Sequence, residues 1–167
     1  MVLTKSELLA SLKNEVRILL HLAGKVDRAK LDYRPTPKQR STLDLLKYLS
    51  MMGPELVRAI KASAFDEAAW TAAEQAAAAQ TFDQAVAKIA THADVYATLL
   101  ADVSDADLRT QIELFGEETT RGACLVNWVL CGCAAYRTQL FLYLKACGRE
   151  ELNTMNLWSG VDAPPAD

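Results

Sequence analysis

The stretch CGCAAYRTQLFLYLKACG (Cys131–Gly148) has the pattern of the last long helix of a helical bundle. Apolar and aromatic side chains recur at three- and four-residue spacing here and just upstream, which places them on one helix face. This face consists of Leu125, Trp128, Val129, Gly132, Tyr136, Leu140 and Tyr143. Gly148 suits the position after a helix C-terminus. We therefore predict one long helix that begins at Thr119 or Thr120 and buries this face.

Three further amphipathic helices are predicted upstream. The first begins with a capping-box pattern at Thr4, the second is capped by Ser41, and the third begins with a second capping box at Thr81. The apolar stripe of the third helix extends to Val103. Four amphipathic helices of this length predict an all-α four-helix bundle.

The segments between the helices have distinct compositions. The proline-containing linker DYRPTPKQRS (residues 32–41) precedes the second helix, and the pair Gly53-Pro54 within that helix favours a kink or a restart. The alanine-rich residues 66–80 form the long connection between the second and third helices, either as a helix packed by Trp70 or as a weakly ordered segment. Residues 109–122 have the alternation and the glycine of a bent loop or short hairpin.

These elements predict two parts of the chain. Residues 1–150 form the bundle domain, and residues 151–167 form a polar C-terminal tail whose expected anchor is Leu157-Trp158. The chain has no internal repeat, no glycine-rich phosphate loop and no alternation of strands with helices. A single domain of this length can bury a sizeable core.

Composition and charge exclude some classes of partner. The formal net charge is -3 and no basic patch stands out, so we expect no nucleic-acid partner. The N-terminal residues lack the apolar core of an export signal, so we expect a cytoplasmic protein. The most apolar stretch, residues 123–135, is too short to span a bilayer and contains Asn127, so we expect no membrane insertion.

The four cysteines do not form a recognisable framework. Cys131 and Cys133 are two residues apart on a predicted helix, so their side chains point roughly 200° apart and cannot grip one ion together. Small buried side chains are the interpretation we favour for the cysteines.

A family resemblance follows from two segments, residues 33–49 (YRPTPKQRSTLDLLKYL) and residues 133–148 (CAAYRTQLFLYLKACG). With the helix order and the Phe115-Gly116 loop, they resemble the DinB-like superfamily of four-helix bundles. Members of this superfamily include metal-dependent thiol transferases and hydrolases of the YfiT type. The resemblance implies a DinB-like bundle with one metal-binding histidine on the second helix and two on the last.

None of these histidines is present in this chain. Tyr48 stands at the position of the histidine on the second helix, and Gly132 and Tyr136 stand at the two positions on the last helix. Glycine has no ligand atom, and a phenol with a pKa of about 10 is a poor ligand for a divalent ion near neutral pH. The chain contains only two histidines, His21 and His92, too few for a three-histidine site. We therefore predict no metal and no cofactor at this site.

The same positions predict a binding cavity. If the resemblance gives the correct register, Tyr48 and Tyr136 face each other across the bundle, and Gly132 leaves room for a ligand. The alternative is that the two rings fill the space and hydrogen-bond to each other or to water. The candidate ligand-binding residues are Tyr48, Met52, Trp128, Gly132, Tyr136 and His92. Core packing is the alternative for Met52, Trp128 and His92.

Other polar residues are predicted to be structural. Arg137 and Gln139 match the DinB-like pattern, and Gln139 should lie near the inner face whereas Arg137 points away from it. We expect Arg137 to pair with a carboxylate in the loop of residues 105–118, and His21 to lie at the surface or at an edge.

The sequence therefore favours a binding or accessory protein without metal chemistry over an enzyme. A small apolar or weakly polar molecule is the expected ligand, and a homodimer is the expected assembly. One alternative is a metal-dependent transferase or hydrolase with a relocated metal site, and another is a purely structural dimerisation module.

Overall fold

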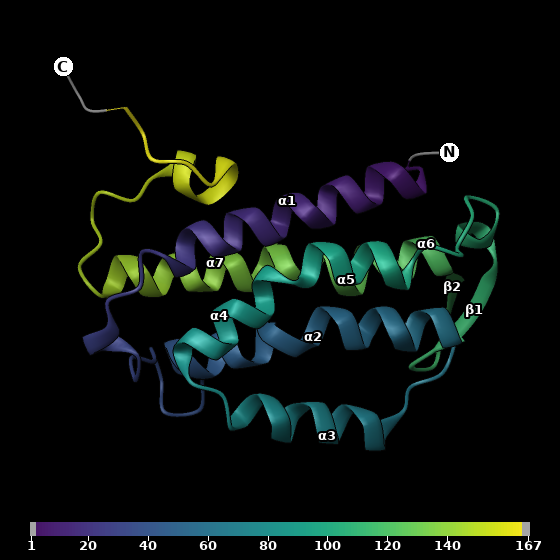
Figure 1. The fold of residues 1–167 in the computed structure, drawn as a ribbon, viewed down its shortest axis with the longest axis horizontal. Helices are drawn as coiled ribbons and strands as arrows, with labels where there is room; N and C mark the ends of the chain where they lie inside the picture. The colour runs from purple at the N-terminus through teal and green to yellow at the C-terminus, as the bar shows by residue number, and fades with distance from the viewer. Residues whose placement is uncertain (1–2, 165–167) are drawn as a thin grey trace.

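Four long helical segments pack together in the computed structural model, which describes residues 3–164 (Figure 1). The first two are α1 and α2, the third is built from α4 and α5, and the fourth runs through α6, the π-helical segment η3 and α7. The helical elements are α1 (Lys5–Ala23), η1 (Arg28–Lys30), α2 (Thr42–Ala62), α3 (Glu67–Ala78), α4 (Phe82–Ala90), α5 (His92–Leu99), η2 (Asp107–Arg109), α6 (Arg121–Cys124), η3 (Leu125–Leu130), α7 (Cys131–Ala146) and η4 (Met155–Ser159). The predicted all-α bundle is confirmed.

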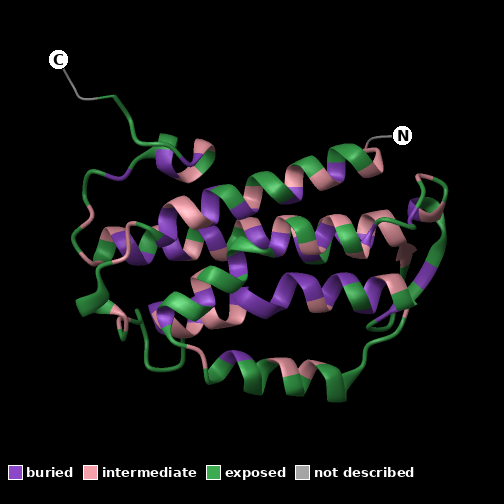
Figure 2. Cartoon of the chain, viewed as in Figure 1, coloured by how far each residue is buried: buried purple, intermediate pink, exposed green. Residues whose placement is uncertain are grey.

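The long connection between the second and third helices is helical. It contains α3, which lies along α2 at the edge of the bundle (Figure 1). Ala77 is its buried residue, and most of its surface faces solvent (Figure 2). Asp66 caps its N-terminus by accepting a hydrogen bond from the backbone of Ala69.

The helix starts follow the capping signals in the sequence. Thr4, Ser41 and Thr81 each accept a hydrogen bond from the backbone N–H three residues later, in complete capping boxes. Thr120 caps the start of α6 in the same way, through the N–H of Ala123. Removing such a cap costs about 1 kcal/mol of stability, so these side chains fix where each helix begins.

Helix α2 continues through Gly53 and Pro54, so the predicted restart at this pair is wrong. Proline has no N–H to donate to the carbonyl four residues earlier, which is that of Ser50. The imidazole Nε2 of His92, buried on α5, donates to this carbonyl oxygen at a distance of 2.9 Å. His92 therefore supplies the hydrogen bond that Pro54 removes.

The third helix is divided at Thr91, where one unbroken helix up to Val103 was predicted. The hydroxyl of Thr91 donates to the carbonyl of Lys88 at 2.8 Å. Such a bond from a side chain to its own backbone competes with regular helix geometry. The helical segment α5 then ends at Leu99.

The last helix is continuous from α6 to α7, but residues 125–130 are π-helical. A π-helix bonds each N–H to the carbonyl five residues earlier, so α-helical spacing no longer decides which side chains share a face. Val129 is buried as predicted, whereas Trp128 is 41% exposed. The prediction that both lie on the buried face is therefore wrong for Trp128.

A short hairpin precedes this helix, as one of the two readings of residues 109–122 predicted. Strands β1 (Gln111–Leu114) and β2 (Glu117–Thr120) are antiparallel, with Leu114 opposite Glu117. The two turn residues, Phe115 and Gly116, both have positive φ angles, of 57° and 77°. This is the backbone that two-residue hairpin turns favour, and it places an aromatic side chain at the tip.

The C-terminal segment folds back on α1 through η4 (Figure 1). Leu152 and Asn156 are buried, whereas Trp158 is 69% exposed. Leu152, Asn156 and the partly buried Leu157 therefore hold the tail on the bundle, whereas Trp158 of the predicted Leu157-Trp158 anchor does not pack into it. The last three residues of the predicted tail lie outside the described part of the chain.

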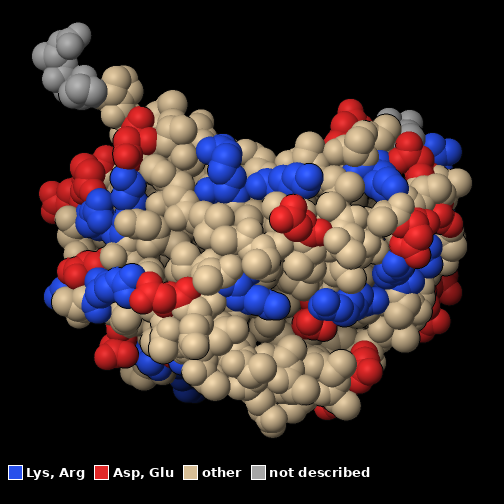
Figure 3. All heavy atoms as spheres, in the orientation of Figure 1, with Lys and Arg blue, Asp and Glu red and all other residues tan. Residues whose placement is uncertain are grey.

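The surface carries both signs of charge. On the face shown in Figure 3, Lys and Arg side chains alternate with Asp and Glu side chains over the helices. Within residues 3–164, no helix combines the length and the apolar character that crossing a membrane requires.

Candidate ligand-binding site

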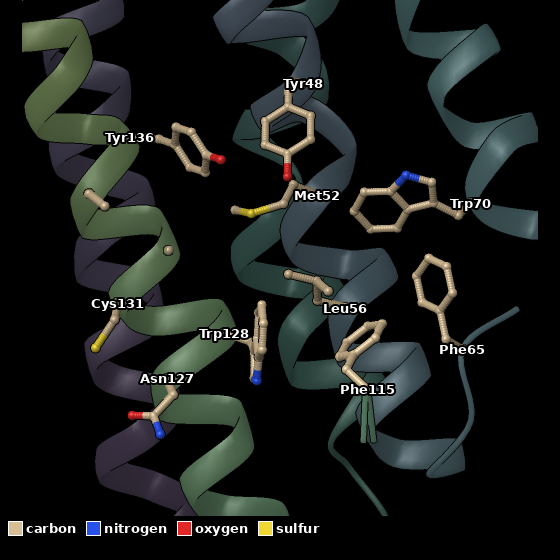
Figure 4. A pocket seen from close by; sticks show the side chains of 12 residues that line it. Tyr48, Met52, Leu56, Phe65, Trp70, Phe115, Asn127, Trp128, Cys131 and Tyr136 are labelled. Carbon is tan, nitrogen blue, oxygen red and sulfur yellow. The ribbon is translucent and has the colours of Figure 1, made fainter. Parts of the chain in front are cut away.

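A cavity of about 710 Å³ lies between α2 and α7, beside the N-terminal half of α3 and the hairpin tip. Three successive turns of α2 form one wall, and the end of η3 with the start of α7 forms the opposite wall (Figure 4). The lining residues are Tyr48, Met52, Leu56, Phe65, Trp70, Phe115, Asn127, Trp128, Cys131, Gly132, Ala135 and Tyr136. Five of the six predicted site residues are among them.

Tyr48 and Tyr136 meet at one end of the cavity. Their ring centroids are 5.2 Å apart and the rings are inclined at 71°, an edge-to-face contact. Both hydroxyl groups point into the space between α2 and α7, near Met52 (Figure 4). Burial, followed by the neighbouring Tyr136, raises the pKa of the Tyr48 phenol well above its usual value. The Tyr48 phenol is therefore protonated near neutral pH and can donate a hydrogen bond.

Gly132 forms an open part of the wall. A Cβ atom placed on it would lie 3.6 Å from Sδ and 3.8 Å from Cε of Met52, which are ordinary contact distances. Helix packing therefore does not require glycine at this position. Its effect is to leave space in the cavity that a larger side chain would fill.

Six aromatic rings surround the cavity in an unbroken series of neighbouring contacts. The distances between successive ring centroids lie between 5.1 and 6.4 Å. The series runs from Tyr136 through Tyr48, Trp70, Phe65 and Phe115 to Trp128. The first and last rings, Tyr136 and Trp128, both lie on the last helix. The series of rings therefore curves around the cavity (Figure 4).

His92 does not line this cavity, so its place among the candidate ligand-binding residues is corrected. Its ring is buried on α5, donates to the Ser50 carbonyl and packs edge-on against Tyr96, with ring centroids 5.7 Å apart. Burial lowers the pKa of His92 to about 4, and the bond to Ser50 only partly opposes this effect. His92 is therefore a neutral structural residue.

Three aromatic wall residues were not predicted from the sequence. Phe65 follows the C-cap of α2, Trp70 lies on α3, and Phe115 lies at the hairpin tip. Only their tertiary placement brings them together, because each belongs to a connection and not to a bundle helix. The available signal was the presence of bulky aromatic residues in connections that are otherwise polar or alanine-rich.

Arg137 and Gln139 are structural, but not in the predicted way. Arg137 is buried and pairs with Glu15 of α1 at 2.7 Å, and not with a carboxylate of the loop before the hairpin. Its guanidinium also donates to the carbonyl of Leu157 in η4. Gln139 donates to the hydroxyl of Tyr143, which in turn donates to a backbone carbonyl in the linker before α2. Arg137 thus connects α7 to α1 and η4, and Gln139 supports the bond of Tyr143 to the linker. These contacts lie outside the cavity lining.

Two solved structures share this architecture. The DinB-like protein YjoA from Bacillus subtilis matches with a TM-score of 0.67 and 18% identity, over 87% of this chain and 94% of its own. A DinB-like protein from Bacillus cereus matches with a TM-score of 0.70 and 14% identity, over 89% and 95%. The chain has a DinB-like fold. Neither a protein-family model nor a curated protein matches the sequence.

The residues at the positions where the sequence resemblance implies metal ligands do not fit a metal ion. Tyr48, Gly132 and Tyr136 all line the cavity, but together they offer two phenol oxygens and no third ligand. A catalytic site for a divalent transition ion needs about three nitrogen, sulfur or carboxylate ligands. Elsewhere in the described part of the chain, no group of three or more His, Cys, Asp or Glu side chains is placed to hold an ion.

Proposed function

We propose that this DinB-like protein binds a small, mainly apolar molecule in the cavity between α2 and α7, and that it does so without a metal and without catalysis. The observation that carries the proposal is the cavity itself, with its volume of about 710 Å³ and Gly132 in its wall. Small-molecule sites typically occupy about 300–1,000 Å³ and are lined mainly by apolar and aromatic side chains. The cavity meets both conditions.

The proposal includes the loss of the metal site that the resemblance implies. The three positions that should carry imidazoles carry two phenols and a hydrogen atom. The high pKa of the Tyr48 phenol disfavours the phenolate, which is the form that binds a metal ion. The cavity thus keeps the location of a DinB-like site with different chemistry.

The lack of a catalytic pair supports a binding role. Cys131 is the nucleophilic residue in the lining, and its sulfur points away from the aromatic rings (Figure 4). Both histidines lie outside the cavity and are bonded elsewhere, His92 to Ser50 and His21 to Asn156. Cys131 therefore has no imidazole within reach to act as its base.

The experiment is to fill the cavity and measure binding of N-phenyl-1-naphthylamine, an uncharged dye whose fluorescence increases in apolar sites. We expect the wild type to bind the dye and Gly132→Leu to lose binding, because the leucine side chain occupies the space beside Met52. Gly132→Ala should reduce binding less, since its Cβ makes only ordinary contacts. Circular dichroism and thermal unfolding verify that each variant is folded.

The matched control is a substitution in a second apolar cavity. This cavity has a volume of about 690 Å³ and lies between the N-terminal end of α1 and η3. Ala123→Leu places the same leucine side chain in its wall, on α6, whereas Gly132 lies on α7. We expect this variant to bind the dye like the wild type. Loss of binding in Ala123→Leu together with normal binding in Gly132→Leu would contradict the proposed site.

We also propose a homodimer as the assembly, to be tested by sedimentation equilibrium. Exposed apolar side chains on the last helix, including Leu142 with 58% exposure, provide a surface for such an interface. Leu142→Lys should then shift the equilibrium toward monomer. A wild type that is monomeric at all concentrations would contradict this assembly.

A further inference from the structure

We infer that the ligand of this cavity is an uncharged, flat aromatic molecule that carries one hydrogen-bonding group. The inference rests on the proposed function and specifies the chemical class of the ligand. Three observations carry it, namely the continuous aromatic wall, the lack of charge in the lining, and the position of the two phenols at one end.

The aromatic wall favours a flat ligand. Neighbouring rings in the wall are inclined at 48° to 71° to one another, so they meet as edges and tilted faces and not as parallel stacks. Rings arranged in this way present both edges and faces, and an aromatic ligand can match them with offset or edge-to-face contacts. A saturated ligand of the same size would gain only the burial of its surface.

The outer part of the wall is exposed although it is aromatic. Phe65, Phe115 and Trp128 are 39%, 46% and 41% exposed, respectively. These three rings contact one another in series and come from the α2–α3 connection, the hairpin turn and η3, respectively. A cluster of exposed aromatic rings around a cavity is typical of a binding surface, because water-exposed apolar area is otherwise unfavourable.

The lining disfavours a charged ligand. None of the described residues that line the cavity carries a charge. The guanidinium of Arg40 lies 3.8 Å from the ring centroid of Tyr48 and is not part of the cavity lining. Arg40 already makes a cation–π contact with Tyr48, and its charge repels a second cation beside that ring. An anion would lose its hydration without finding an ionic partner in the lining.

The phenols supply one polar end. The hydroxyl groups of Tyr48 and Tyr136 point into the same part of the space, at the end opposite the hairpin tip (Figure 4). Each phenol can donate one hydrogen bond and accept another. A ligand with a hydroxyl or carbonyl group at one end therefore satisfies them while its rings contact the aromatic wall.

The experiment is competition against N-phenyl-1-naphthylamine with four bicyclic compounds of similar size. 2-Naphthol has the proposed chemistry, decahydro-2-naphthol is its saturated form, 2-naphthoate is an anion and N-methylquinolinium is a cation. We expect 2-naphthol to displace the dye at a concentration about tenfold lower than each of the other three. The two alcohols have the same carbon skeleton and similar apolar surface, so burial alone predicts similar displacement by both.

Two tryptophan substitutions distinguish an effect of the aromatic wall from a general effect on the protein. Trp128→Leu removes one ring of the wall, and it should weaken 2-naphthol about three- to tenfold while changing decahydro-2-naphthol less than about twofold. Trp158→Leu removes a more exposed tryptophan outside the cavity and should change neither. Because both side chains are substantially exposed, neither substitution should unfold the protein.

The outcomes distinguish the two proposals. Equal or tighter binding of decahydro-2-naphthol, or of either ion, would overturn the proposed ligand class while leaving the cavity as a binding site. Binding of the dye that Gly132→Leu leaves unchanged would overturn the proposed function, and the ligand class with it. No binding of the dye or of any of the four compounds would contradict both.

Discussion

Gly53 of α2 and Tyr96 of α5 fit directly against each other. A Cβ atom on Gly53 would overlap the hydroxyl oxygen of Tyr96 and would lie 3.1 Å from its Cζ atom. Tyr96 is buried, so it has little room to move away. This contact brings α5 close to α2 immediately behind Met52, and it thereby fixes the wall of the cavity from the side of the core.

The first prediction tests this fit. Gly53→Ala should lower the free energy of unfolding by about 1–3 kcal/mol, because the added methyl group overpacks the core. In a Tyr96→Phe background the same substitution should cost less, since the hydroxyl group that it meets has been removed. Urea unfolding of the four proteins of this double-mutant cycle measures the coupling. Equal costs in both backgrounds would show that the two residues do not interact.

The second prediction concerns pH and His92. The pKa of His92 is about 4 in the folded protein and 6.5 in the unfolded chain. Between these values the unfolded chain binds a proton that the folded protein does not, so stability falls as the pH falls from 6.5 to 4. The expected loss from this residue is about 3 kcal/mol.

His92→Gln provides the control for this effect. Glutamine keeps an N–H group for the Ser50 carbonyl but does not titrate. The difference in unfolding free energy between wild type and variant should therefore change in favour of the variant as the pH decreases from 6.5 to 4. A difference that is constant over this range would contradict a buried neutral imidazole.

The third prediction concerns the ion pair of Arg137 and Glu15. Their side chains are only 6% and 12% exposed, so Glu15→Gln leaves a buried guanidinium without its charge partner. We expect a loss of about 3–5 kcal/mol in thermal or urea unfolding. The exposed pair of Arg28 and Asp83 is the matched control, and Asp83→Asn should cost far less than Glu15→Gln. Similar costs for both substitutions would be inconsistent with burial of the first pair.

The fourth prediction concerns the two phenols. Tyr48→Phe and Tyr136→Phe should each weaken 2-naphthol about two- to tenfold, the range expected for one lost hydrogen bond. Binding of naphthalene, which has no hydroxyl group, should change little. Competition against the dye measures both compounds. A parallel loss for naphthalene would mean that the substitutions change the shape of the cavity and not its polar end.

The bundle helices could be predicted because local signals agree with tertiary packing. The capping residues Thr4, Ser41, Thr81 and Thr120 begin helices in the structure, and the apolar stripes that follow are largely buried. Helix caps and apolar periodicity depend on neighbouring residues, so a sequence displays them directly. The predicted secondary structure and site residues were wrong or incomplete where contacts with residues distant in the sequence decide the structure.

Pro54 is the clearest case of such a failure. Its effect on α2 is decided by His92, which is 42 residues from Ser50 along the chain. The aromatic wall is a similar case, since Phe65, Trp70 and Phe115 meet only because α3 and the hairpin pack beside α2 and η3. Such contacts between connections have no local pattern. The sequence therefore predicted the wall residues of the bundle helices, namely Tyr48, Met52, Trp128, Gly132 and Tyr136, and missed Phe65, Trp70 and Phe115.

We propose that the cavity of this DinB-like fold holds an organic ligand and no metal ion. The most direct test is elemental analysis of protein purified without a histidine tag from cells supplied with nickel, zinc, iron and manganese. We expect far less than one equivalent of any of these metals, with dye binding that a chelator does not change. One equivalent of a transition metal that Tyr48→Phe or Tyr136→Phe removes would contradict it.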